Sequence, residues 1–439
     1  MNPLTSEQIT QIAPDAASVK AAKGLGLSKW VLLEQHDHTI WGHCQGSGSN
    51  PYQTAVDLSG EPAFKCSCPS RKFPCKHALA LLFLFSEQTP KFLAQTPPDW
   101  VTKWLDKRQQ NQANKAAKAE HAAPVDPVAQ QKRFEARLKK ASEGLADLQL
   151  WLNDLLRNGL VQLRNNQSTR FHDMAKRMID AQLPAIAGQL QQLANLPSSR
   201  QAELWLGLSK LHLLSQSFNH IASFDEAWQA EIYSRLGFPI AKESVLTRPA
   251  IMDTWFNIGH TTLEIDRGEA HYYWLYGAAQ QQFAFILDFV IHNAPAQTVP
   301  VLVGAQYAGE LCFYAGVAQQ RAISKTWEIL PQSLPLPPAQ NTIAHASQQV
   351  QQHHQLNPFI TYTPLRLDHV QLVRQAEHHA LSDGKHILPI QLNETQQLFL
   401  LSETFGKPFT AFVLFHHDTH QSRLLSFSNP HGQMKVLSC

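Results

Sequence analysis

The chain has 439 residues, of which 44% are hydrophobic and 16% charged, so it is long enough for two to four domains with cores of their own. Its 37 Lys and Arg residues nearly balance its 35 Asp and Glu residues, so any basic surface must be local. The N-terminus does not read as a secretory signal and no stretch reaches the ~18 apolar residues of a membrane span, which predicts a cytoplasmic protein without disulfides.

The first predicted elements are four strands followed by a helix. The strands are segments rich in β-branched and aromatic residues, separated by turns, at residues 30–35, 39–45, 52–58 and 63–67. From Lys76 the sequence KHALALLFLF is apolar nearly all round, which is typical of a buried helix.

Three cysteines and a histidine lie where the last of these strands gives way to the helix. Cys66 and Cys68 are two apart on a strand and so present their sulfurs on one face. Cys75 is expected just before the helix and His77 in its first turn. Three thiolates and one imidazole make a closed tetrahedral set, which predicts one structural zinc ion. Cys44, on an earlier strand, is interpreted as a half-buried structural cysteine.

Two other interpretations of the cluster are weaker. A disulfide between Cys66 and Cys68 has poor strand geometry, and a catalytic thiol finds no acid nearby to orient a base. Four cations surround the cluster and would favour its thiolate forms. They are also the predicted contacts to a partner or to phosphate groups: Lys65, Arg71, Lys72 and Lys76.

The pattern Cys66-x-Cys68, six residues, then Cys75-x-His77, after paired strands and before a helix, resembles the SWIM-type zinc finger. All four ligands of that family's pattern are present. The surrounding sequence is similar to a bacterial group of SWIM proteins over residues 14–105, and in fragments up to about residue 185. The resemblance implies a ββα zinc module that binds DNA or proteins. It also suggests MoxR-type AAA ATPases and von Willebrand A-domain proteins as partners.

The complete chain is predicted to be an α+β multidomain protein with a zinc finger, a central helical bundle and a C-terminal β-rich and α+β region. Within the last region, residues 367–381 are expected to be helical and residues 396–403 to form a strand. The expected divisions are a finger domain 1–105 with its core at 52–85, a linker 106–130, a helical domain 131–240, a β-rich domain 241–330, a proline-rich joint 331–345 and a small α+β domain 346–439.

No enzyme motif is recognised. The sequence lacks a complete dinucleotide fingerprint, a phosphate loop, a His-Glu-x-x-His pair and a Gly-x-Ser-x-Gly elbow. The segment HHDTH at residues 416–420 is a weak alternative metal site, but it lies between two strands, where a polar turn is expected. The predicted function is therefore an interaction module for protein or nucleic acid. An enzyme with an unrecognised site in the C-terminal β-rich half, or a thiolate–zinc redox sensor, are the alternatives.

Overall fold

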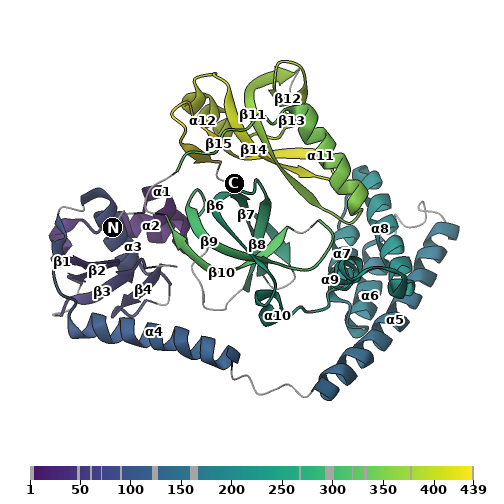
Figure 1. The fold of residues 1–439 in the computed structure, drawn as a ribbon, viewed down its shortest axis with the longest axis horizontal. Coiled ribbons are helices and arrows are strands. Elements are labelled where there is room, and N and C mark those ends of the chain that lie inside the picture. The colour runs from purple at the N-terminus through teal and green to yellow at the C-terminus, as the bar shows by residue number, and fades with distance from the viewer. Residues whose placement is uncertain are drawn as a thin grey trace.

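The structure is a computed structural model with four parts in chain order, namely a finger domain, a helical bundle, a β-barrel and a C-terminal sheet (Figure 1). Within the described residues, no helix is long and apolar enough to cross a membrane. The residues described are 4–46, 50–59, 62–70, 72–88, 91–120, 127–158, 167–265, 268–291, 301–318, 320–330, 334–375 and 378–437.

The finger domain is built on a five-stranded sheet of order β4-β3-β2-β1-β5. All four predicted strands and the predicted helix are present, and two short helices precede them. The elements are α1 (Ser6–Gln11), α2 (Ala16–Lys23), β1 (Trp30–His36), β2 (Thr39–Cys44), β3 (Tyr52–Asp57), β4 (Ala63–Cys66), α3 (Lys76–Gln88) and β5 (Leu93–Ala94).

Helices cover both faces of this sheet. The apolar side chains of α3 are buried on one face, as the sequence predicted. The other face is covered by α4 (Asp99–Glu120), whose Val101 is buried with Trp41 and Ala55. On the same helix, Arg108 pairs with the buried Asp57 across 3.4 Å. The finger domain therefore has three layers, with the sheet between α3 and α4.

Much of the predicted linker at 106–130 is helical. The helix α4 continues to Glu120, and α5 begins at Pro127. The reason is compositional, because the Ala, Gln and Lys residues that marked this segment as a linker are also among the strongest helix formers. Residues 121–126 lie outside the described residues.

The helical bundle is formed by five helices with a common core. Leu145, Leu148 and Leu152 of the first helix are buried together with Phe171 and Leu211 of its neighbours. This agrees with the helical domain predicted over residues 131–240. The helices are α5 (Pro127–Asn158), α6 (Gln167–Asp180), α7 (Pro184–Ala194), α8 (Gln201–Asn219) and α9 (Glu226–Leu236).

A short helix, α10 (Lys242–Leu246), leads into a closed five-stranded barrel of order β10-β8-β7-β6-β9. Neighbouring strands are antiparallel except β8 and β10, which are parallel. This connectivity is that of the oligonucleotide/oligosaccharide-binding (OB) barrel. The strands are β6 (Ala250–Ile265), β7 (Gly268–Gly277), β8 (Phe283–Ile291), β9 (Gln306–Phe313) and β10 (Arg321–Ile329).

The barrel and the finger domain share one cluster of buried apolar residues. It includes Leu79 and Phe85 of α3 together with Trp255 and Leu311 of the barrel. In Figure 1, α1 and α2 lie on the side of the finger domain that faces the barrel. The finger is therefore packed against the barrel and is not connected to the rest of the chain through α4 alone.

The C-terminal part is a six-stranded sheet of order β13-β12-β11-β14-β15-β16 with two helices. Two sequence predictions were wrong here, because residues 367–375 and 378–381 are in strands and residues 396–403 are helical. The elements are α11 (Ile343–Leu356), β11 (Tyr362–Gln375), β12 (His378–Ser382), β13 (Ile387–Ile390), α12 (Glu394–Thr404), β14 (Phe409–His416), β15 (Gln421–Ser428) and β16 (Met434–Val436).

Tertiary pairing and capping explain these two differences. The strand β11 pairs with β14 on one side and β12 on the other, which overrides its weak helical pattern. The apolar run after residue 395 becomes helical because Asn393 and Gln396 form a capping box at its start.

One face of the barrel is covered by the C-terminal sheet. Phe256, Trp274 and Tyr276 of the barrel are buried against Phe412 and Leu425 of β14 and β15. Aromatic contacts cross this interface, including Tyr276 to Phe412 at 5.2 Å between ring centroids. The two β units therefore pack as one body.

Candidate metal centre

The four predicted ligands converge where β4 ends and α3 begins. Cys66 is the last residue of β4, Cys75 directly precedes α3, and His77 is its second residue. With Cys68, their ligand atoms all lie within 4.8 Å of one another. Zinc bonds of about 2.3 Å to sulfur and 2.0–2.1 Å to nitrogen place tetrahedral S and N ligands roughly 3.6 Å apart. The 3.8 Å between Cys66 Sγ and His77 Nδ1 is close to this spacing, so the four residues are positioned to bind one zinc ion.

Residues of β3 hold the ligands in place. Thr54 lies opposite Cys66 in the strand register, and its Oγ1 is 3.3 Å from Cys66 Sγ. The Tyr52 ring lies against the His77 ring with 4.9 Å between centroids. These two neighbours were not predicted. The strand pairing would have indicated Thr54, because it faces Cys66 once the turn between β3 and β4 is placed.

Hydrogen bonding and burial shift the pKa values of the three thiols in opposite directions. The pKa of Cys66 is lowered to about 3, chiefly because the Cys75 thiol donates a hydrogen bond to it. The pKa of Cys75 is raised by that same hydrogen bond and by burial, and burial also raises the pKa of Cys68. Zinc requires thiolates, so binding releases the protons held by Cys75 and Cys68.

Among the residues that the structure describes, no fifth ligand joins this group. Cys44 is fully buried on β2, deeper than the half-buried structural cysteine predicted, and burial raises its pKa to about 11, which favours the neutral thiol. Within the described part of the chain, the four-residue cluster is the one group of three or more His, Cys, Asp or Glu side chains arranged to hold a metal. Zinc bound there would have four protein ligands and no open position. Its contribution is structural, since it joins the end of β4 to the start of α3.

The alternative metal site at residues 416–420 does not form. These residues make the turn between β14 and β15, as the strand pattern predicted. Asp418 pairs with Lys210 of the bundle, and the His417 ring stacks on His354 with 5.3 Å between centroids. The segment attaches the C-terminal sheet to the helical bundle.

The predicted cation group is largely used inside the finger domain. Lys65 donates from Nζ to the Trp100 carbonyl at 2.9 Å and lies over the Trp100 ring. Lys72 pairs with Asp15 at the start of α2, at 2.6 Å. Lys76 is exposed, and Arg71 lies outside the described residues. Lys65 and Lys72 therefore have partners within the finger domain, and contact of the four cations with phosphate stays a prediction.

Two segments match known family models. Residues 52–84 match the SWIM zinc finger, and residues 136–236 match the SWIM-associated four-helix bundle domain. Residues 52–84 are a SWIM zinc finger. The second match runs from α5 to α9, so the helical bundle is the domain that accompanies this finger. No curated protein and no solved structure is significantly similar to the chain.

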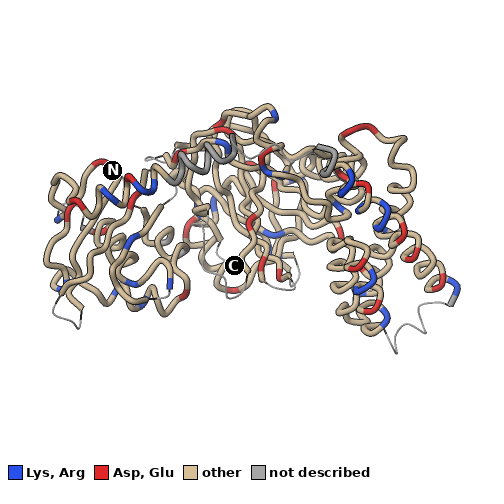
Figure 2. Tube along the Cα trace, turned by 90° about the horizontal axis from the view of Figure 1, so that it is seen from below, with Lys and Arg blue, Asp and Glu red and all other residues tan. Residues whose placement is uncertain are grey.

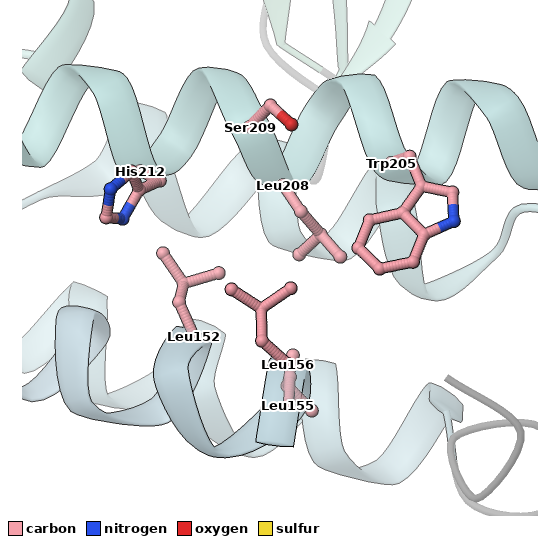
Figure 3. A pocket seen from close by; sticks show the side chains of 7 residues that line it. All are labelled: Leu152, Leu155, Leu156, Trp205, Leu208, Ser209 and His212. Atoms are coloured by element: carbon pink, nitrogen blue, oxygen red, sulfur yellow. The ribbon is translucent and has the colours of Figure 1, made fainter. Parts of the chain in front are cut away.

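The bundle contains a small apolar pocket between α5 and α8 (Figure 3). Its volume is about 160 Å³, below the roughly 300–1,000 Å³ of most small-molecule sites. Ser209, His212 and the indole N–H of Trp205 are the polar groups of the lining, which contains no Asp, Glu, Lys or Arg side chain. The pocket is lined by Leu152, Leu155, Leu156, Trp205, Leu208, Ser209 and His212.

Proposed function

We propose that the chain is an interaction module whose zinc-stabilised finger domain binds a partner macromolecule, and that this partner is a protein. The closed ligand set carries the proposal. A zinc ion with three thiolates and one imidazole has no position left for water or substrate, so we assign it no catalytic role. We further propose that the chain is not an enzyme.

Protein is favoured over nucleic acid by the cations and by the exposed surface of the zinc loop. Lys65 and Lys72 are engaged by Trp100 and Asp15, which reduces the charge available for phosphate. Phe73, two residues before Cys75, leaves 44% of its surface exposed although its ring lies edge-on to Phe64. Aromatic side chains are enriched at protein interfaces relative to the rest of the surface, whereas Lys is depleted there. Figure 2 also shows cationic and acidic positions interspersed over the finger domain and the bundle.

Affinity purification of the full chain, with and without nuclease, tests this proposal. We expect protein partners that persist after nuclease treatment and are lost in a Phe73→Ala/Lys76→Ala variant. Val31→Ser is the matched control, because Val31 is exposed on β1 of the same domain. MoxR-type ATPases and von Willebrand A-domain proteins, suggested by the family resemblance, are the first candidates to examine.

A direct titration separates the nucleic-acid alternative. If nucleic acid is the partner, anisotropy with single- and double-stranded pools should show binding that weakens steeply with salt. Removing one phosphate contact should then reduce the log–log salt slope by about 0.9 on duplex or 0.7 on single strands. Recovery of partners only without nuclease, together with such a slope change in Lys76→Ala, would contradict the protein assignment.

A further inference from the structure

Four histidines lie together where the C-terminal sheet meets the helical bundle. His353 and His354 are in the last turn of α11. His416 ends β14, and His417 begins the turn that leads to β15. In Figure 1 this end of α11 lies next to the bundle. We call these four residues the histidine junction.

The histidine junction lies between two attachments of the C-terminal unit to the bundle. On one side, Asp418 pairs with Lys210 of α8. On the other side, just after α11, Asn357 donates to the carboxylate of Glu231 on α9 at 2.9 Å. The nearby Phe359 side chain is buried in the bundle core. The junction therefore connects the two segments that carry these attachments.

His416 shapes the turn only while its Nδ1 atom carries no proton. Nδ1 accepts from the backbone N–H groups of Asp418 and Thr419, at 3.2 and 3.3 Å. A protonated Nδ1 is a donor and cannot accept either hydrogen bond. The neutral ring thus holds the turn in the shape that presents Asp418 to Lys210.

A buried hydroxyl connects His417 with α11. The Thr363 Oγ1 atom lies 2.8 Å from Nε2 of His417 and 3.2 Å from Nδ1 of His353. A hydroxyl has one hydrogen, so it satisfies both rings when one ring accepts from it and the other donates to it. The accepting ring must then be neutral.

Burial and neighbouring charges oppose the protonation of His417. Burial is the largest cause that lowers its pKa to about 4, and His354, Lys210 and His353 act in the same direction. Asp418 acts in the opposite direction. The His417 ring stacks on His354 with 5.3 Å between centroids, so protonation of both rings brings like charges together.

Two further rings of the junction are held neutral in the same way. Burial lowers the pKa of His353 and of His416. Tyr362 lies edge-on to His416 and stays neutral in acid, since burial raises its pKa. The charged side chains that act on His416 form two ion pairs, namely Asp418 with Lys210 and Glu203 with Arg200. Protonation therefore adds net positive charge to the junction.

We infer that the histidine junction makes the attachment of the C-terminal sheet to the helical bundle sensitive to acid. With neutral rings, the turn after β14 and the end of α11 are held together, and both bundle attachments form. Protonation breaks the hydrogen bonds of His416 and of Thr363 and sets like charges against each other, so the two segments separate. The inference is independent of the function proposed for the finger domain.

Hydrogen exchange of the full chain at pH 7 and pH 5 tests this inference, after correction for the intrinsic pH dependence of exchange. Two amides report opening of the junction, because the His417 N–H donates to the Thr361 carbonyl and the Asn357 N–H donates to the His353 carbonyl. If the pKa of His417 rises from about 4 in the closed junction to about 6.5 in the open one, the opening equilibrium constant increases about twentyfold between pH 7 and pH 5.

We expect these two amides to exchange about twentyfold faster at pH 5, or more where other rings of the junction also gain protons. The Leu148 amide, in the bundle core, should change by less than about threefold. This comparison within the wild type needs no variant.

Two variants locate the effect. His417→Gln removes the titrating ring, so the acceleration between pH 7 and pH 5 should be at least about fivefold smaller than in the wild type. His345→Gln is the matched control, because His345 is exposed at the start of α11, and it should keep the wild-type acceleration. The ratio of rates at the two pH values is compared, so the test holds if His417→Gln loosens the junction at pH 7.

Three results would overturn the inference. Equal acceleration of the junction amides and the Leu148 amide would indicate general acid unfolding. Junction amides whose corrected exchange does not change with pH would show that the rings do not control the attachment. A His417→Gln variant with the full wild-type acceleration would show that the sensitivity to acid arises elsewhere.

Discussion

Arg366 offers a sharp test of how the barrel and the C-terminal sheet are joined. Its side chain is 4% exposed and pairs with Asp368, which is 3% exposed, across 3.0 Å. It also donates to the Tyr276 hydroxyl at 3.1 Å and to the Pro337 carbonyl at 2.7 Å. One guanidinium thus connects β11, the barrel and the extended joint, and Arg366→Met removes all these hydrogen bonds.

The expected cost follows from what remains buried. Removing one partner of a buried ion pair typically costs about 3–5 kcal/mol, because the other charge is left without compensation. Asp368 would keep hydrogen bonds from the Asn341 backbone and the Thr410 hydroxyl. We therefore expect the lower end, about 3 kcal/mol.

Urea unfolding followed by tryptophan fluorescence measures this loss. Arg374→Met is the control, because Arg374 is exposed on the same strand and should change the free energy of unfolding by less than about 0.5 kcal/mol. The double variant Arg366→Met/Asp368→Leu should recover part of the loss, since it leaves no buried charge. An Arg366→Met variant as stable as Arg374→Met would refute the reasoning.

Three further predictions concern the finger and its neighbours. Lys65→Met should leave the dependence of nucleic-acid affinity on salt concentration unchanged, because the Lys65 ammonium donates to the Trp100 carbonyl. A smaller log–log salt slope in this variant would show that Lys65 contacts phosphate. Burial lowers the pKa of His417 to about 4, because the folded protein favours the neutral imidazole. The contribution of neutral His417 to the free energy of unfolding should therefore be complete above pH 6.5. It should fall by about 3 kcal/mol as the pH drops to 4. Comparing wild type with His417→Gln in denaturant at pH 7 and 4.5 measures this difference, and parallel pH profiles would contradict it. Chelation should speed hydrogen exchange at Trp255 in the barrel as well as in α3, because both lie in one apolar cluster; loss of protection confined to the finger would show that the two units are independent.

The metal ligands were accessible from sequence because their geometry is local. The two-residue spacing of Cys66 and Cys68 on a strand, and the position of His77 in the first turn of a helix, depend only on neighbouring residues. The apolar run after Lys76 likewise marked α3 without reference to the rest of the fold.

The misassigned parts depend on contacts between distant residues. Residues 367–370 became part of a strand because β14 pairs with them from about forty positions away, and residues 371–375 because β12 pairs with them. The roles of Lys65 and Lys72 were set by Trp100 and Asp15, which no sequence spacing links to the zinc loop. Residues 106–120 of α4 were taken for part of a linker because their composition fits both states.

The zinc content of the full chain tests the central claim most directly. Elemental analysis of protein purified without added metal should give close to one zinc per chain, and Cys75→Ser should lose it. Cys44→Ala should retain one zinc, because the buried Cys44 thiol lies outside the ligand group. Full zinc in Cys75→Ser, or loss of zinc in Cys44→Ala with Cys75→Ser unaffected, would contradict the ligand set of Cys66, Cys68, Cys75 and His77.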